Sequence, residues 1–181
     1  MKLLGNYNSW KRFSAEMNGQ FQEKNNEFNM PHISFNIDGD EVIYKIDKIH
    51  NKILPKFETN LKMELDHKEI LNLRLYLKKA TRRLSHKENE IDGIGEVKIS
   101  DSEFNERFKI YTNNVQYARE MMNKSVIKRL IIGIPINKLS IETIEKKIHI
   151  CMYTKGAVKN IETLRKMYYL IIEILGSIRE I

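Results

Sequence analysis

The chain has 181 residues, of which 41% are hydrophobic, so it is long enough for one domain with a packed core. Its 8 glycines and 3 prolines are too few for a collagen-like or proline-rich protein, and its single cysteine excludes a disulfide framework and a four-cysteine zinc site. The net charge of +7 and the isoelectric point near 9.3 allow an anionic partner without requiring one.

The first half of the chain predicts one helix followed by four strands. The helix is expected over residues 8 to 25, where Trp10, Phe13, Met17 and Phe21 recur at helical spacing. The strands are expected at 33–37, 42–46, 57–65 and 71–77. Asp38-Gly39 between the first two strands is typical of a tight hairpin turn, because both residues tolerate a positive φ.

The second half begins after a polar connector at residues 81–93. Short strands are expected near 97–99 and 109–112, with a turn of helix between them that starts at Ser100 or Asp101. Helical segments follow at 115–122 and 125–132, strands at 139–141 and 147–153, and a long C-terminal helix at about 158–180.

This order of elements predicts an α+β fold, in which antiparallel sheet carries helices packed on one side. We treat residues 1–181 as a single domain. Halves 1–80 and 94–181, joined by the connector, have a similar layout without a repeat at the residue level.

The C-terminal helix carries an apolar stripe at spacings of three and four residues. A stripe of this kind packs on a sheet or on a partner helix, so a homodimer through this helix is one of two expectations. The stripe consists of Leu164, Tyr168, Ile171, Leu175 and Ile178.

One segment, residues 78–87, concentrates positive charge. A solvated connector is the simpler interpretation, and contact with phosphate groups of a nucleic acid or of an anionic membrane surface is the alternative. The candidate anion-contacting residues are Lys78, Lys79, Arg82, Arg83 and Lys87. Tyr44, Tyr76, Tyr111 and Tyr153 each fall on a predicted strand, where single-stranded nucleic acid can stack, but packing in the core or at its rim explains them better, because the basic and aromatic spacing of known RNA-binding strands is missing.

No set of residues predicts catalysis. His149 and Cys151 share one face of a predicted strand, but two further zinc ligands or an oxyanion hole are not indicated by the pattern. Asp101 suits the start of a short helix. Gly93-Ile94-Gly95 lacks the third glycine of a phosphate-binding loop. We therefore expect no metal and no cofactor.

Three segments together resemble a large prokaryotic family without an assigned activity. Trp10 to Phe21 is similar to the family's opening pattern, Trp-x-x-apolar-Ala-x-x-apolar-x-Gly-x-Phe. Ile99 to Phe108 is similar to its central segment, Ile-Gly-Asp-x-x-Phe-Asp-x-x-Phe, except that Ser100 and Asn105 replace a glycine and an aspartate. Tyr153 to Asn160 is similar to a third mark that leads into the last helix. The resemblance implies an α+β fold and transfers no site residue.

The sequence therefore predicts a non-enzymatic binding or interaction domain. A nucleic-acid-binding protein that uses residues 78–87, a membrane-surface adaptor and an enzyme of unknown class are the alternatives. The two most apolar stretches, 130–136 and 168–178, fall short of the roughly 20 apolar residues of a membrane span. Because Trp10-Lys11-Arg12 interrupts the N-terminal region, no signal peptide is expected either, and we expect a cytoplasmic location.

Overall fold

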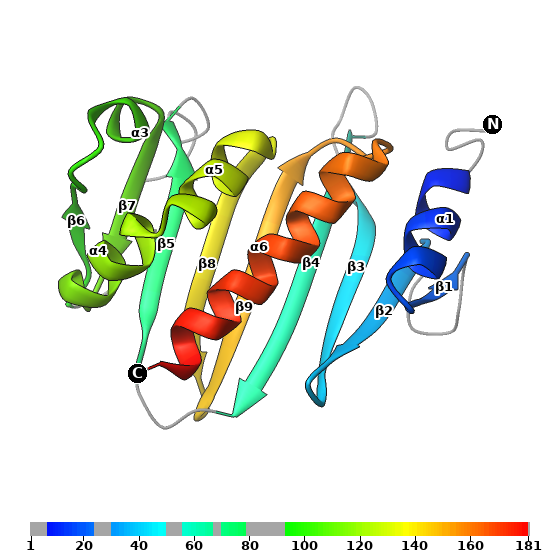
Figure 1. Cartoon of the computed structure of the whole chain (residues 1–181), viewed down its shortest axis with the longest axis horizontal. Helices are drawn as coiled ribbons and strands as arrows, with labels where there is room; N and C mark the ends of the chain where they lie inside the picture. The colour runs from blue at the N-terminus through cyan, green and yellow to red at the C-terminus, as the bar shows by residue number, and fades with distance from the viewer. Residues whose placement is uncertain (1–6, 24–29, 50–55, 67–69, 79–92, 181) are drawn as a thin grey trace.

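The computed structural model describes residues 7–23, 30–49, 56–66, 70–78 and 93–180. These residues form one sheet of nine strands with helices on one of its sides (Figure 1), which confirms the α+β prediction. The strands are β1 (Gln20–Gln22), β2 (His32–Ile37), β3 (Asp40–Ile49), β4 (Lys56–Asp66), β5 (Asn72–Leu77), β6 (Gly95–Val97), β7 (Phe108–Thr112), β8 (Ile136–Ile144) and β9 (Lys147–Lys155). The helices are α1 (Asn8–Glu16), α3 (Ser102–Arg107), α4 (Val115–Asn123), α5 (Ser125–Gly133) and α6 (Ile161–Arg179).

The strand order across the sheet is β1-β2-β3-β4-β9-β8-β5-β7-β6, and every neighbouring pair is antiparallel. β9 and β8 lie between β4 and β5, although β4 and β5 are successive strands in the chain. β5 pairs with β8 on one side and with β7 on the other. The two halves of the chain therefore share one hydrogen-bonded sheet.

The hairpin between β2 and β3 has the turn that its sequence predicts. Asp38 and Gly39 adopt φ angles of 54° and 98°, as the two central residues of a tight turn require. The Gly39 amide donates to Asn36 Oδ1 at 3.0 Å. Arg179, in the last turn of α6, pairs with Asp38 at 2.6 Å and thereby connects the turn to the end of the chain.

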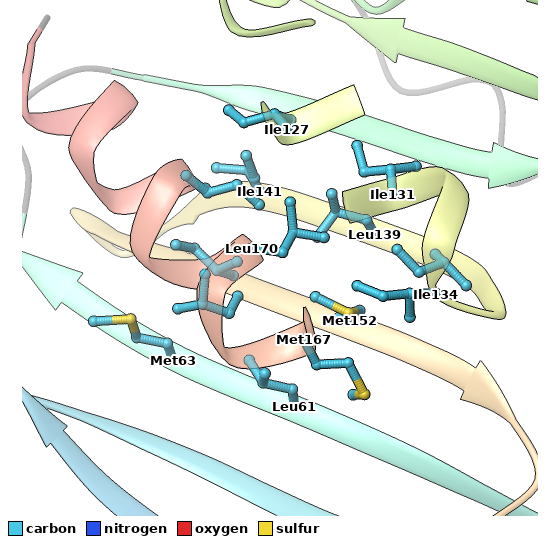
Figure 2. Close-up of a cluster of buried hydrophobic side chains, with 14 of the residues drawn as sticks. Leu61, Met63, Ile127, Ile131, Ile134, Leu139, Ile141, Met152, Met167 and Leu170 are labelled. Atoms are coloured by element: carbon cyan, nitrogen blue, oxygen red, sulfur yellow. The ribbon is translucent and has the colours of Figure 1, made fainter. Parts of the chain in front are cut away.

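Alternation along the strands places the core between the sheet and the helices. In β9, for example, Ile148, Ile150, Met152 and Thr154 are fully buried, and the residues between them are not. Burying alternate apolar residues under helices is the main stabilising contribution in such a two-layer fold. Figure 2 shows Met152 together with Leu61 of β4 and Leu139 of β8, beneath Met167 and Leu170 of α6.

Side chains that precede the helices fix where several of them begin. Asn114 Oδ1 accepts from the Tyr117 amide at the start of α4, and Asn160 Oδ1 accepts from the Thr163 amide at the start of α6. Asparagine is a favoured residue at this position because its side chain satisfies an amide that has no partner within the helix.

The first helix is shorter than its sequence pattern suggests, so the prediction of a helix to residue 25 was wrong. α1 ends at Glu16, Asn18 turns the chain with a φ of 54°, and β1 follows. A β-carbon on Gly19 would lie 2.4 Å from the Phe35 ring, so only glycine lets the backbone pass at this point. Phe21, the last residue of the apparent helical stripe, lies on β1 instead.

Candidate functional site

The side of the sheet opposite the helices is the first candidate surface, and we call it the outer face. On it, the strand registers bring side chains from distant segments into straight rows. One row crosses Lys45, Asn60, Tyr153, Lys138, Tyr76 and Lys109. The neighbouring row crosses Ile43, Lys62, Cys151, Ser140, Arg74 and Tyr111. No helix among the described residues covers these rows.

Tyrosines and cations alternate where the outer face crosses β9, β8, β5 and β7. The Lys138 ammonium lies 5.7 Å from the centre of the Tyr76 ring, and the Lys109 ammonium lies 6.0 Å from that of Tyr111. The Tyr76 and Tyr111 rings meet edge to face at 6.1 Å. Tyr76 is only 3% exposed, whereas Tyr111 and Tyr153 are half-buried and so remain partly accessible to solvent.

Ion pairs hold several of these cations in place. Arg74 of β5 pairs with Glu142 of β8 at 2.5 Å, and Lys109 of β7 pairs with Glu96 of β6 at 3.1 Å. The Lys109–Glu96 pair is the more exposed of the two, so it contributes little stability and Lys109 can exchange Glu96 for another anion at little cost.

The other end of the outer face, on β3 and β4, is more acidic. Lys45 pairs with Asp47 at 3.0 Å, and Asn60 donates to the same carboxylate. Burial and the neighbouring Asp47 carboxylate raise the pKa of Glu58. Positive charge on the outer face therefore predominates on β9, β8, β5 and β7, although Lys45 and Lys62 lie on β3 and β4.

His149 and Cys151 share the outer face, as their spacing predicts, but they do not form a reactive pair. His149 Nδ1 lies 3.3 Å from Glu64 across the strands. Burial raises the pKa of the Cys151 thiol, so the group stays protonated at neutral pH and is a poor nucleophile. Burial and the adjacent Cys151 raise the pKa of Tyr153 to about 12. Within the described residues, no three His, Cys, Asp or Glu side chains gather as metal ligands.

The predicted anion-contacting residues fall mostly outside the described part of the chain. Lys79, Arg82, Arg83 and Lys87 belong to residues 79–92, which the structure does not describe. Lys78 is described and follows β5 directly, two residues after Tyr76. The basic segment therefore starts at the positive part of the outer face.

The predicted interface stripe on α6 lies inside the chain's own core. Leu164, Ile171 and Ile178 have no exposed surface, and Leu175 is 2% exposed. Tyr168 is half-buried, and its ring packs against Phe35 at 5.3 Å. Of the two expected partners for this stripe, a sheet or a second helix, the fold uses the sheet.

A pocket of 210 Å³ between α4 and the end of α6 is the second candidate site, and the sequence offers no pattern that predicts it. Two of its lining residues, Tyr117 and Ser177, are 5% and 4% exposed. Their hydroxyl groups are buried and have no hydrogen-bond partner among the described residues. At the same pocket Lys124 pairs with Glu180 at 2.6 Å. Polar residues on one predicted helix do not reveal such a site, because the pocket forms only where α4 meets the end of α6, some 60 residues later in the chain.

The segments that carry the family resemblance have structural roles in this fold. The Trp10 indole donates to the Val158 carbonyl at 2.7 Å in the core, which joins the first of these segments to the third. Asp101 accepts from the Phe104 amide at 3.0 Å and so begins α3. Asn105 donates to the Ile99 carbonyl at 2.7 Å and accepts from the Ile99 amide at 3.1 Å. An asparagine in place of aspartate can make both of these bonds.

No helix within the described residues is long and apolar enough to cross a membrane.

Comparison with other proteins adds a family and no individual relative, because no curated protein and no solved structure matches this chain. A family model described as "Protein of unknown function (DUF3137)" matches residues 49–167. That range contains the central and third resembling segments and excludes the one that begins at Trp10. Because the match covers more than half of the 181 residues, the chain belongs to this family of unknown function.

Proposed function

We propose that this chain is a binding domain that acts through the outer face of its sheet, and that the partner is single-stranded nucleic acid. The observation that carries the proposal is the row in which Tyr153, Lys138, Tyr76 and Lys109 alternate across four neighbouring strands, with Tyr111 beside it. No step of catalysis is needed to account for this arrangement.

Alternating rings and cations suit a chain of bases and phosphates. Bases of any sequence stack on aromatic side chains, and lysines neutralise the phosphates between them. Tyr111 and Tyr153 are accessible enough to stack. Tyr76 is too buried for that role and instead supports the Tyr111 ring from the side.

The charge distribution favours the same partner. The net charge of the whole chain is +7, and Lys78, the first residue of the basic segment, directly follows β5. A polyanion lying across β9, β8, β5 and β7 would also meet Lys155, which lies at the exposed end of β9. Since the opposite end of the outer face is acidic, we expect the bound nucleic acid not to contact β3 and β4.

Binding of a labelled oligothymidylate, followed by fluorescence anisotropy at increasing salt, tests the proposal. The affinity should fall linearly with salt on logarithmic axes, because bound phosphates release counterions. Tyr111→Leu and Tyr153→Leu should each weaken binding by about 5- to 160-fold, the range expected for the loss of one stacked base. Lys138→Gln should weaken binding and reduce the slope of the salt dependence.

Tyr169→Leu is the matched control, because Tyr169 is a 48% exposed tyrosine on α6, on the helix side of the sheet. It should bind like the wild type. The proposal fails if the wild type shows no binding at low salt, or if both outer-face tyrosine variants bind as tightly as Tyr169→Leu does.

A further inference from the structure

The pocket between α4 and α6 has features of a ligand site that the outer face does not explain. The hydroxyls of Tyr117 and Ser177 are both buried, both lack a partner among the described residues, and both residues line the same pocket. Leaving a buried hydroxyl without a hydrogen bond is costly, so two of them at one cavity indicate that something polar occupies it.

The hydroxyls act as hydrogen-bond donors in this pocket. Burial and the negative charge of Glu180 raise the pKa of Tyr117, so its hydroxyl keeps its proton at any physiological pH. Ser177 always carries a hydroxyl proton. Lys124 lines the same pocket and has N–H groups beyond the one directed at Glu180. Together these three groups form a set of donors suited to a carboxylate.

The remaining charged groups of the pocket are acceptors. Glu120 and Glu180 both line it, and only part of their hydrogen-bonding capacity is used. Glu120 accepts from Gln116 at 2.9 Å, and Glu180 accepts from Lys124 at 2.6 Å. With one lysine and two glutamates, the pocket would repel a simple anion but accommodate a positive group next to a negative one.

From these groups we infer that the α4–α6 pocket binds a small zwitterion of the free amino acid class. The ligand's carboxylate lies toward Tyr117, Ser177 and Lys124, and its ammonium group lies toward Glu120 and Glu180. The volume of 210 Å³ is below the usual range for drug-sized ligands, about 300–1,000 Å³, and so suits a molecule of this size. The pocket lies in the helix layer, on the other side of the sheet from the outer face, so this inference stands or falls independently of nucleic-acid binding.

Thermal unfolding of the full chain with four matched probes tests the inference. The probes are L-alanine, N-acetyl-L-alanine, which lacks the ammonium group, L-alaninamide, which lacks the carboxylate, and sorbitol, a neutral polyol. At a concentration about 100 times its Kd, L-alanine should raise Tm by about 5–10 °C. The other three probes should leave Tm unchanged at the same concentration, because each lacks one or both of the charged groups.

Variants then locate the site. Tyr117→Phe and Ser177→Ala each remove one hydroxyl and almost no volume, and each should weaken L-alanine binding by about 10-fold or more, as measured by calorimetry. Tyr44→Phe is the control, because it removes another buried, unpartnered hydroxyl that does not line the pocket. It should bind L-alanine as the wild type does. Using both Tyr117→Phe and Ser177→Ala keeps the test valid if one of them fails to fold.

Three results would overturn the inference. The first is no change of Tm with L-alanine, which would mean that water alone fills the pocket. The second is an equal effect of sorbitol, which would indicate a site for neutral polyols. The third is wild-type affinity for L-alanine in both Tyr117→Phe and Ser177→Ala, which would place the bound amino acid elsewhere.

Discussion

Tyr44 is a tyrosine in a position that suits phenylalanine. It has no exposed surface, and its ring lies 5.6 Å from Phe13 and 5.3 Å from Phe35. Its hydroxyl is buried and has no hydrogen-bond partner among the described residues. Burial raises its pKa well above the ordinary value. The aromatic ring therefore stabilises the cluster while the hydroxyl opposes that effect.

We expect Tyr44→Phe to raise the free energy of unfolding by about 1 kcal/mol, because the substitution removes an unsatisfied polar group and keeps the packing. Urea denaturation measures the change. Tyr168→Phe serves as the control, since Tyr168 contacts the same cluster but is only half-buried, and its hydroxyl should contribute little. A loss of stability in Tyr44→Phe would show that the hydroxyl has a partner in solution.

Asp101 connects two helices through one carboxylate. It accepts from the Phe104 amide at the start of α3 and pairs with Lys128 of α5 at 2.9 Å. These bonds lower the pKa of Asp101, the backbone bond most of all. A carboxylate with a lowered pKa stabilises the fold above its unfolded-state pKa, and that contribution disappears as the pH falls through the folded-state value.

Asp101→Asn should therefore be less stable than the wild type at neutral pH, and the difference should shrink as the pH falls below about 4. Urea midpoints measured along this pH series would show the convergence. A difference that stays constant with pH would mean that the charge of Asp101 contributes nothing.

At the scale of elements, α6 has one buried and one exposed apolar side. Ile171 is fully buried against the sheet, and its neighbour Ile172 is 36% exposed. Tyr169, one turn earlier on the helix, is 48% exposed. If the chain forms a dimer through α6, the contact has to use Tyr169 and Ile172, because the stripe beginning at Leu164 is already covered.

Ile171→Ala should lower the free energy of unfolding by about 2–5 kcal/mol, since it leaves a cavity in the core. Ile172→Ala should change it by less than about 0.5 kcal/mol in a monomer. Chemical denaturation measures both changes in stability, and native mass spectrometry shows whether the chain is a monomer or a dimer. Equal effects of the two substitutions on stability would show that the exposed side of α6 is an interface. So would a wild-type dimer that becomes a monomer in Ile172→Ala.

Elements with strong local signals were predictable, and those fixed by distant contacts were not. The Asp38-Gly39 turn and the stripe on α6 depend on residues close together in the chain. In both cases the local sequence alone favours the observed conformation. The early end of α1 depends on the Phe35 ring lying against Gly19, which no local pattern reveals. The same limit applies to the candidate sites. The strands that carry Tyr111 and Tyr153 were expected, but their position beside Lys138 follows from registers between segments far apart in the chain.

At the scale of the whole molecule, the sheet joins what the sequence suggests as two halves. β5 belongs to the first half and pairs only with β7 and β8 of the second among the described strands. Trp10 near the N-terminus bonds to Val158 near the C-terminus. The buried core is one cluster with residues from both halves, so we expect both to unfold together.

We expect one cooperative unfolding transition. Fluorescence of Trp10, the single tryptophan, reports on the packing of α1, and far-ultraviolet circular dichroism reports on the whole sheet. Their urea transitions should coincide, as for a two-state domain. The separate fragments 1–80 and 94–181 should show no cooperative transition. Two distinct transitions, or a fragment that folds alone, would show that the halves are independent.

The position of β9 also affects how the chain is made. β4 ends at Asp66, and its neighbour β9 begins at Lys147. The ribosome therefore adds about 80 residues after β4 before it begins to make the strand that pairs with it. At about 5–20 residues per second this interval lasts roughly 4–16 s, during which β4 lacks its partner on that side. Its exposed residues Lys62, Glu64 and Asp66 are charged, and charged side chains on an edge strand discourage pairing with other chains. We therefore expect these three side chains to keep β4 from pairing with other chains until β9 has been made.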